Sequence, residues 1–226
     1  MISAAVIEAL KEIVPADKVL LQEPMKLHTT FRIGGPADCL VYLENEEQLC
    51  KIQKYLRLVD VPYTVIGNGS NLLVSDQGYA GIVLVVGKHM SRIEVKDCYL
   101  EAEAGALMSQ VAKAAKEHGL TGLEFAAGIP GTIGGGAVMN AGAYGGEMKD
   151  VLASVTYLTR EGEIVTEDAA NLDLSYRHSI FEENGGCILS AKFHLKRGDS
   201  AAIKARMDEL MQKRIDKQPL GRPGAG

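Results

Sequence analysis

Helical and strand-like hydrophobic patterns alternate along the chain without a strict order. Apolar residues recur every three or four positions in four segments, which predicts helices over 2–13, 45–57, 105–118 and 199–216. Asn45 and Asp199 precede two of these segments and are candidate N-caps. Runs rich in β-branched residues predict short strands over 38–43, 63–66, 81–86, 92–95, 99–102, 154–159, 163–165 and 188–195. This mixture indicates an α+β fold rather than a doubly wound parallel sheet.

The composition is typical of a soluble globular protein. The chain has 226 residues, of which 46% are hydrophobic and 23% charged, enough for at least one full hydrophobic core. Charged residues near the N-terminus argue against a signal peptide, and no segment approaches the roughly 18 apolar residues of a membrane span. The four cysteines form no C-x-x-C pair, which favours reduced thiols and neither a disulfide nor a metal site. We therefore expect a cytoplasmic protein that neither enters a membrane nor binds a metal.

The charge distribution narrows the class of partner. The formal net charge is -5, and the only basic run is the short stretch 213–217. A nucleic-acid groove or an anionic membrane surface would require a basic face. Small molecules are therefore the expected partners.

A first glycine-rich segment follows the predicted strand 63–66. Its small polar residues predict a turn that returns as another strand, and its successive N–H groups would suit a pyrophosphate. An ordinary β-turn explains the same residues equally well, because Asn-Gly is a common hairpin signal. The candidate cofactor ligands here are Gly67, Asn68, Gly69, Ser70, Asn71 and Leu72.

A second glycine-rich segment spans residues 128–147. A Pro-Gly turn with Thr132 as the N-cap of a helix would direct helix N–H groups towards a phosphate, and the small side chains would leave room for a flat ring. Tight helix packing without a ligand is the alternative. The candidates here are Gly128, Pro130, Gly131, Thr132, Gly134, Gly135, Asn140, Ala141, Gly142 and Ala143.

Neither segment matches a standard nucleotide-binding motif. The pair Gly67 and Gly69 is followed by Leu72 where a Rossmann fingerprint has its third glycine, and no Gly-Lys-Ser or Gly-Lys-Thr of a P-loop occurs. The sequence therefore gives little support to Rossmann-type NAD binding or to P-loop ATP binding.

Four motifs together resemble the UDP-N-acetylenolpyruvoylglucosamine reductase family, in its shorter subtype. They are His28 to Ala37 (HTTFRIGGPA), Gly67 to Leu73 (GNGSNLL), Gly128 to Glu147, and Ser175 to Phe181 (SYRHSIF). The resemblance implies a PCMH or vanillyl-alcohol-oxidase-type FAD-binding fold of two α/β subdomains with the flavin between them. It also implies a domain order of an N-terminal helical segment (1–27), the FAD-binding domain (28–196, divided near residue 88), and the start of a substrate domain (197–226).

The resemblance implies a reaction and its residues as well. NADPH would reduce FAD, and the reduced flavin would deliver hydride to the enolpyruvyl group of the UDP-sugar substrate, giving UDP-N-acetylmuramate for peptidoglycan. Arg177 matches the family's catalytic arginine, and Tyr176 beside it would help shape the site.

Arg214 and Lys217 are candidates for the substrate phosphates, with an exposed basic helix end as the alternative. Without the resemblance, Tyr176 and Arg177 would be interpreted as a buried ring and a surface salt bridge. The five histidines are expected to be surface or packing residues.

The sequence departs from the family at its end. After Gln218-Pro219-Leu220 the family normally continues into a segment that carries a proton-donating serine, whereas this sequence runs Gly221 to Gly226. We expect a truncated reductase with weak activity, and a genuine short flavin-binding protein is the alternative. Two further function classes stay open, namely a related flavin oxidase or dehydrogenase and a non-catalytic flavin-binding module.

Overall fold

The computed structural model describes residues 2–224, which form two compact units. One unit comprises the chain up to Met90 together with the end from Pro223, and the other is Ser91–Arg222. The helical segment at the N-terminus belongs to the first unit and the C-terminal helix to the second. The division into an N-terminal segment, a flavin domain and a substrate domain stays a prediction. Ala225 and Gly226, where truncation is expected, lie outside the described residues.

The first unit is built on a four-stranded sheet. Its strands are β1 (Val19–Pro24), β2 (Pro36–Leu43), β3 (Tyr63–Ile66) and β4 (Tyr79–Val86), in the order β1-β2-β4-β3. β2, β4 and β3 are parallel and β1 is antiparallel to β2. The buried run of β4 suits a parallel strand covered on both faces. The predicted strands 38–43, 63–66 and 81–86 are confirmed, whereas β1 was missed because its C-terminal half is polar and largely uncovered.

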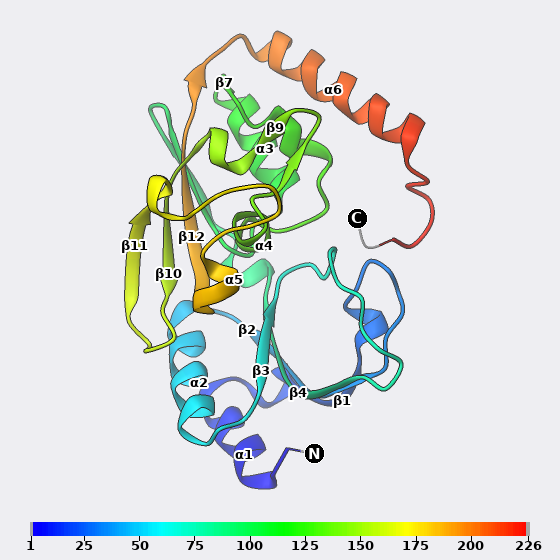
Figure 1. The fold of residues 1–226 in the computed structure, drawn as a ribbon, viewed down its shortest axis with the longest axis vertical. Coiled ribbons are helices and arrows are strands. Elements are labelled where there is room, and N and C mark those ends of the chain that lie inside the picture. The colour runs from blue at the N-terminus through cyan, green and yellow to red at the C-terminus, as the bar shows by residue number, and fades with distance from the viewer. Residues whose placement is uncertain (1, 225–226) are drawn as a thin grey trace. The chain divides into compact units, whose positions relative to one another are not determined.

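Two helices accompany this sheet. They are α1 (Ala4–Ile13) and α2 (Glu46–Leu58), which lie next to each other in Figure 1. α2 links the parallel strands β2 and β3, and its N-cap is the predicted Asn45, whose Oδ1 accepts from the N–H of Gln48 at 3.0 Å. On one face of the sheet, a buried cluster contains Met25, Ala37, Leu40, Ile66, Val83 and Val85.

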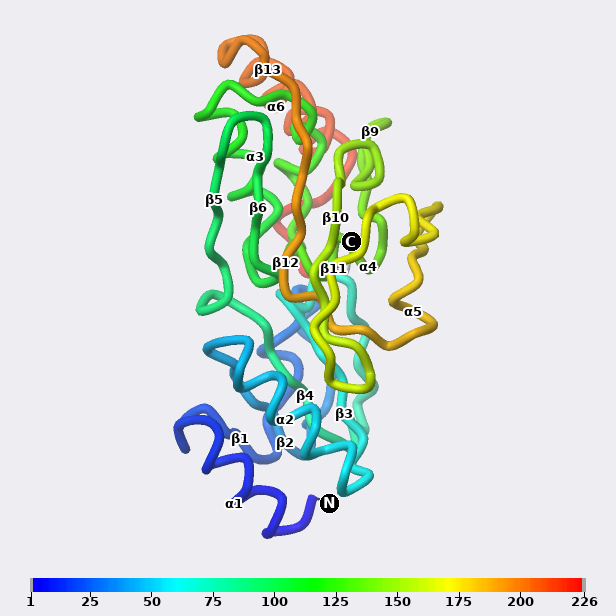
Figure 2. The backbone as a smooth tube through the Cα atoms, turned by 90° about the vertical axis from the view of Figure 1, so that its left-hand side faces the viewer, coloured from blue at the N-terminus to red at the C-terminus, as the bar shows by residue number. Residues whose placement is uncertain are grey.

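The second unit is built on a five-stranded antiparallel sheet. Its strands are β5 (Ile93–Lys96), β6 (Tyr99–Glu103), β10 (Leu152–Leu158), β11 (Ile164–Asp168) and β12 (Cys187–His194). Figure 2 shows them side by side in the order β11-β10-β12-β6-β5. All five strands were predicted, within about three residues at their ends. β5, β6 and β11 show the alternating burial that gives a period of two.

Helices and two short strand pairs complete this unit. The helices are α3 (Met108–Glu117), α4 (Ile133–Val138), α5 (Phe181–Asn184) and α6 (Ser200–Lys217). The strand pairs are β7 (Leu120–Thr121) with β13 (Lys196–Arg197), and β8 (Gly142–Ala143) with β9 (Gly146–Glu147). α6 packs along α3 and the 3₁₀ turn Glu124–Gly128, and its N-cap is the predicted Asp199. The helix α4 follows Thr132, as the predicted N-cap position indicated, whereas α5 was not predicted because it has a single turn.

The remaining short elements are 3₁₀ turns. They are Ala16–Lys18, Met25–Leu27, Lys88–Met90, Met148–Asp150 and Ala169–Asn171. No disulfide joins the four cysteines within residues 2–224, and burial raises the pKa of Cys39 to about 11, with the nearby charge of Asp38 adding to the effect. Within residues 2–224, none of the helices combines the length and apolarity that crossing a bilayer demands, and no group of three potential metal ligands occurs.

Candidate functional site

The first glycine-rich segment is a loop that returns from β3 to β4. Gly67 and the exposed Asn68 form the bend after β3. The prediction of a second strand at 72–74 is wrong, because Leu72 and Val74 pack against the buried cluster of the sheet instead of pairing with a neighbour. The loop is therefore fixed on the sheet by two apolar side chains, and β4 begins only at Tyr79.

Backbone contacts join this loop to the motif His28 to Ala37. A Cβ on Gly69 would lie 1.9 Å from the carbonyl oxygen of His28, and a Cβ on Gly35 would lie 2.1 Å from that of Asp76. The N–H of Gly35 also donates to the carbonyl of Ser75 at 2.8 Å. Two of the four family-like motifs thus meet at distances that only glycine permits.

The tip of the first loop offers hydrogen-bond donors. Within residues 2–224, the backbone N–H groups of Gly69, Ser70 and Asn71 have no acceptor, and neither do the side chains of Ser70 and Asn71. Successive unpaired amides of this kind form an anion-binding nest. This arrangement favours the anion-binding interpretation over an ordinary turn.

The side chain of His28, whose carbonyl lies next to Gly69, has two polar partners. The ring Nε2 of His28 lies 2.8 Å from Oε1 of Glu23, and its Nδ1 lies 3.1 Å from the hydroxyl of Tyr42. Burial, followed by the charge of Glu23, raises the pKa of Tyr42. His28 is thus a satisfied, partly buried histidine that orients the loop. No pattern in the sequence predicts these two contacts of His28, because Glu23 lies in β1 and Tyr42 in β2.

The second glycine-rich segment begins with an extended stretch before α4. Thr132 occupies the predicted N-cap position, but its side chain makes no capping hydrogen bond. The expectation that the first helical N–H groups face a phosphate is wrong for two of them. Ile133 and Gly134 donate to the carbonyls of Ala106 and Ala104, both at 2.8 Å.

Three other amides of this segment are available. In the described part of the chain, no acceptor meets the backbone N–H groups of Gly131, Thr132 and Gly135. Gly135 is exposed, and a Cβ there would meet only Oγ1 of Thr132, at 3.7 Å. Glycine lowers helix stability, so a glycine that no neighbour requires is unexplained by packing. The open space at Gly135 fits a ligand that approaches the backbone closely.

The other glycines of α4 have reasons within the fold. A Cβ on Gly134 would lie 2.9 Å from Cβ of Ala104, and a Cβ on Gly136 would lie 3.0 Å from Sδ of Met108. The packing alternative therefore accounts for Gly134 and Gly136 but not for Gly135.

The end of the second segment forms a tight hairpin. Ala141 is buried, Gly142 and Ala143 form β8, and the turn consists of Tyr144 and Gly145 with φ of 54° and 85°. Two positive φ values in a two-residue turn are typical of a type I′ hairpin, which favours glycine at its second position. Gly145 is therefore explained by the geometry of the turn.

Asn140 has a role within the protein. It is 2% exposed, and its Nδ2 donates to Oε2 of Glu147 at 2.8 Å and to the carbonyl of Ser175 at 2.9 Å, while its Oδ1 accepts from the N–H of Lys149 at 2.9 Å. Both amide hydrogens are thus used inside the protein. As a candidate cofactor ligand, Asn140 keeps only its backbone. Its side chain instead connects the second glycine-rich segment to the loop that carries Arg177.

Arg177 lies at the tip of a two-residue hairpin. Ser175 and His178 exchange both backbone hydrogen bonds at 3.2 Å, which places Tyr176 and Arg177 in the turn. Tyr176 is 87% exposed, and within residues 2–224 Arg177 has no ion pair and no side-chain hydrogen bond. The alternative of a buried ring beside a surface salt bridge is therefore wrong. The guanidinium is presented to solvent without a partner.

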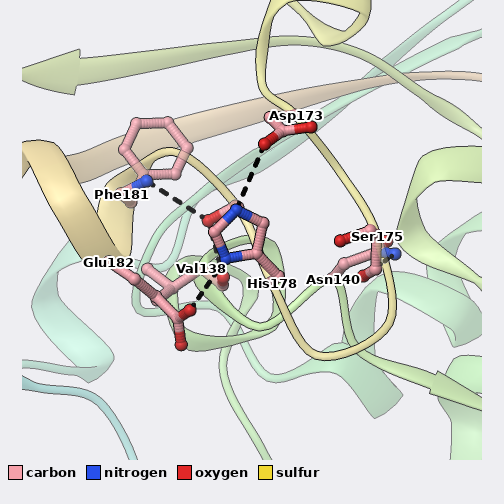
Figure 3. A network of polar contacts seen from close by, with 8 residues as sticks. Val138, Asn140, Asp173, Ser175, His178, Phe181 and Glu182 are labelled. Atoms are coloured by element: carbon pink, nitrogen blue, oxygen red, sulfur yellow. Dashed lines mark hydrogen bonds and ion pairs between the residues drawn. The ribbon is translucent and has the colours of Figure 1, made fainter.

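His178 links two carboxylates beside this tip. Its ring Nδ1 lies 3.1 Å from Oε2 of Glu182 and its Nε2 lies 3.3 Å from Oδ2 of Asp173 (Figure 3). His178 was expected to be a surface or packing residue, and its contacts with Asp173 and Glu182 were not predicted. Their only sequence signal was the spacing of four residues between His178 and Glu182, which places them on the same side of a helical turn.

The two substrate candidates on α6 differ in their surroundings. Arg214 is half-buried, and a Cβ on Gly128 would lie 3.1 Å from its Cδ, so its side chain covers the start of the second glycine-rich segment. Lys217 is exposed in the last turn of α6. The structure thus brings Arg214, and not Lys217, to a predicted cofactor residue.

Comparison with known proteins defines the class. A family model described as "FAD binding domain" matches residues 37–168, more than half of the chain. The fold is shared with solved structures of alkyldihydroxyacetonephosphate synthase (TM-score 0.65, 17% identity, 87% of this chain and 41% of that one) and p-cresol methylhydroxylase (0.63, 16%, 86% and 43%). The chain is a flavoprotein of the FAD-binding-domain class with the PCMH-type fold.

Closer relatives define the family. The chain is 49% identical to a UDP-N-acetylenolpyruvoylglucosamine reductase of Agathobacter rectalis, over 97% of this chain and 74% of that protein. It is 44% identical to the one of Clostridioides difficile, over 96% and 71%. The crystal structure of the Thermus caldophilus enzyme matches with a TM-score of 0.77 at 33% identity, over 92% and 72%. The chain belongs to the UDP-N-acetylenolpyruvoylglucosamine reductase family.

Proposed function

We propose that the chain acts in the NADPH-dependent reduction of UDP-N-acetyl-3-O-(1-carboxyvinyl)-glucosamine to UDP-N-acetylmuramate, a step of peptidoglycan synthesis. The observation that supports this proposal is that Arg177 is exposed at the tip of a hairpin. A cation without an internal partner lies at a hairpin tip that Asn140 ties to a glycine-rich segment with unpaired amides. A purely structural arginine would be expected to have a partner or a packing surface.

Each glycine-rich segment offers donors that we propose for the phosphate oxygens of FAD. Among residues 2–224, these are the unpaired amides of Gly69, Ser70 and Asn71 in the first unit and, considered separately, those of Gly131, Thr132 and Gly135 in the second. The other candidate residues, Gly67, Asn68 and Leu72 of the first segment and Gly128, Pro130, Gly134 and Ala141 to Ala143 of the second, are proposed as cofactor contacts of their own segment. When bound and reduced by NADPH, FAD supplies the hydride for the enolpyruvyl double bond.

Arg177 would stabilise the charge that this reduction creates. Addition of hydride leaves an enolate-like carboxylate on the substrate, and a fixed guanidinium beside it lowers the energy of that state. The planar fork of arginine can bind a carboxylate through two hydrogen bonds, which a lysine cannot match. The exposed ring of Tyr176 would limit how the substrate approaches.

The phosphates of the UDP-sugar require a further cation. Arg214 lies over Gly128 and is proposed for this role, with Lys217 one helical turn further along α6. Because Arg214 makes no ion pair among the described residues, its charge is available to a phosphate. Replacing Arg214 with glutamine should raise the KM for the UDP-sugar more than it lowers kcat.

The decisive experiment measures NADPH oxidation that depends on the enolpyruvyl substrate, with FAD present. Arg177→Gln is expected to lower kcat by about 10² to 10³ fold, as is typical when one charge-stabilising group is removed. Its FAD affinity, measured by flavin fluorescence, should not change. The control is Arg160→Gln, which removes an exposed arginine from the turn between β10 and β11. Full activity of Arg177→Gln would contradict the proposed role.

The same assay separates the other function classes. Consumption of oxygen with an alcohol substrate, and none with the enolpyruvyl sugar, would identify a flavin oxidase. A yellow protein that turns over neither substrate would identify a non-catalytic flavin-binding module. Either result would overturn the proposed reductase activity.

A further inference from the structure

The hairpin tip holds Arg177 in an uncommon backbone conformation. Its φ is 56°, in the left-handed region that residues other than glycine, asparagine and aspartate rarely adopt. Such a conformation persists only where the surroundings enforce it, and it is a recognised feature of functional sites. The contacts that enforce it therefore control how the guanidinium is presented.

Two contacts fix the base of the hairpin independently of pH. Nδ2 of Asn140 donates to the carbonyl of Ser175 at 2.9 Å, and the hydroxyl of Ser179, which is fully buried, donates to the carbonyl of Val138 at 2.6 Å. Neither an amide nor a serine hydroxyl titrates in the physiological range. They attach the loop to the second glycine-rich segment whatever the pH.

The third contact does titrate. His178 directly follows Arg177, and its ring lies between Asp173, which precedes the hairpin, and Glu182 of α5 (Figure 3). Only the imidazolium has a donor on both ring nitrogens, whereas the neutral ring turns a lone pair towards one of the two carboxylates. Both contacts are therefore favourable together only while the ring is protonated.

The surroundings of the ring favour the protonated state. The hydrogen bond to Glu182 first, and then that to Asp173, raise the pKa of His178, against a partial opposing effect of burial. No other charged group among the described residues acts on the ring. In the neighbouring glycine-rich segment, Glu147 and Lys149 pair with each other at 2.6 Å.

We propose that His178 is a positioning residue, which as an imidazolium clamps Asp173 to Glu182 and so holds Arg177 at the hairpin tip. Because the pKa is raised in the folded state, the clamp is complete below the ordinary histidine pKa and is lost as pH rises through the raised value. Loss of the proton releases one carboxylate and loosens the turn. The functional consequence rests on the role proposed above for Arg177, but the clamp itself does not.

Limited proteolysis tests the clamp without cofactor or substrate. Trypsin cleaves after Arg177 only when the hairpin opens, and the cleavage rate follows the open population. The rate after Arg177 is divided by the rate after Arg160, in the same unit, which cancels the pH dependence of trypsin. Between pH 7 and pH 9 this ratio should rise about tenfold in the wild-type chain, as one stabilising contact is lost.

Two substitutions at residue 178 have opposite expected effects. His178→Gln cannot hold both carboxylates, so its cleavage ratio should be high at both pH values. His178→Lys stays charged throughout this range, so its ratio should be low at pH 7 and also at pH 9, whether cleavage is counted after Arg177 or after the new lysine. The matched control is His89→Gln, which changes an exposed histidine of the first unit and should leave the wild-type behaviour intact. NMR titration should show that His178 loses its proton at a pH above the ordinary histidine pKa.

Variants of the carboxylates provide a second measurement. Asp173→Asn and Glu182→Gln each remove one partner and should lower the pH at which His178 titrates. A cleavage ratio that is independent of pH in the wild-type chain, or a His178 that titrates at or below the ordinary histidine pKa, would overturn the clamp. If the clamp is present but Arg177→Gln keeps full activity, the proposed function fails and the clamp stands.

In the active enzyme the clamp should affect kcat rather than KM. Wild-type kcat should fall about tenfold as pH rises through the titration of His178, as expected when a charge-stabilising group is misplaced. His178→Lys should remove this decline. A decline that persists in His178→Lys would show that another group causes it and would overturn the functional part of the inference.

Discussion

The two glycine-rich segments use glycine for different physical reasons. In the first loop, the missing Cβ atoms of Gly69 and Gly78 would each lie 1.9 Å from a backbone oxygen, so two stretches of main chain meet there. In the second segment, Gly134 and Gly136 would meet side chains at 2.9 and 3.0 Å, and Gly135 would meet almost nothing. Side chains can shift to accept an added methyl group, but a backbone oxygen moves only with its loop.

This difference shows what glycine density does and does not indicate. Most glycines of both segments are explained by close approach or by turn geometry inside the protein. Within residues 2–224, each segment also contains amides that have no acceptor, at 69–71 in one and at 131, 132 and 135 in the other, and these are the candidates for ligand contacts. Gly135 is the position where an unpaired amide and unexplained open space coincide.

Gly69→Ala is the strongest way to test the comparison. A methyl group 1.9 Å from the carbonyl of His28, at a φ of 59°, adds a backbone clash to left-handed strain. We expect a loss of about 3 kcal/mol in unfolding free energy, at the upper end for overpacking. Denaturant unfolding of the cofactor-free protein measures it.

The matched control is Gly87→Ala in the same unit. A Cβ there would meet only Cγ1 of Val85, at 3.9 Å, an ordinary contact. Its unfolding free energy should change by less than about 1 kcal/mol, as is usual for a site without a clash. Equal effects of the two substitutions would show that the backbone contact at Gly69 has no special importance.

Asn140→Ala tests how the second segment is held. The first loop is fixed by backbone contact, whereas the second depends on one buried amide with three partners. Removing it leaves buried groups unsatisfied, so we expect a loss of about 2 kcal/mol. Thermal unfolding of the cofactor-free chain gives the value, and trypsin cleavage after Arg177 should become faster.

The control for this substitution is Asn171→Ala. Asn171 is exposed and its amide donates to Glu167 at the surface, so its loss should be within about 0.5 kcal/mol. If Asn140→Ala were equally mild, the amide would not connect the segment to the hairpin.

Much of the fold follows from local patterns in the sequence. The four long helices and eight strands were predicted because their apolar periods are clear, and Asn45 and Asp199 cap helices as their positions indicated. The elements that were missed lack such a period. β1 ends in polar residues, and α5 has a single turn, so only tertiary contacts define them.

The sequence indicated which residues are candidates for the site, but not which of their side chains contact one another. The glycine-rich segments are unusual in composition, whereas Tyr176 and Arg177 became candidates only through the resemblance to the family. The internal role of the Asn140 side chain and the clamp at His178 depend on partners 35 and four to five residues away, respectively. No local pattern specifies which of several polar residues will meet, because that is decided by how the loops fold back.

Gly135→Ala gives the smallest change in stability and the sharpest test of the cofactor role. Because no neighbour occupies the space, the methyl group should stabilise cofactor-free α4 by up to about 1 kcal/mol, the helix preference of alanine over glycine. The same methyl group would occupy the space beside an unpaired amide, so FAD affinity should fall at least tenfold.

Gly134→Ala is the neighbouring control, since its clash with Ala104 should lower stability instead. Opposite signs for stability and flavin binding at Gly135 are expected only if that glycine serves a ligand. Unchanged FAD binding by Gly135→Ala would mean that the open space is not used, and the second segment would then resemble the first in being explained by packing.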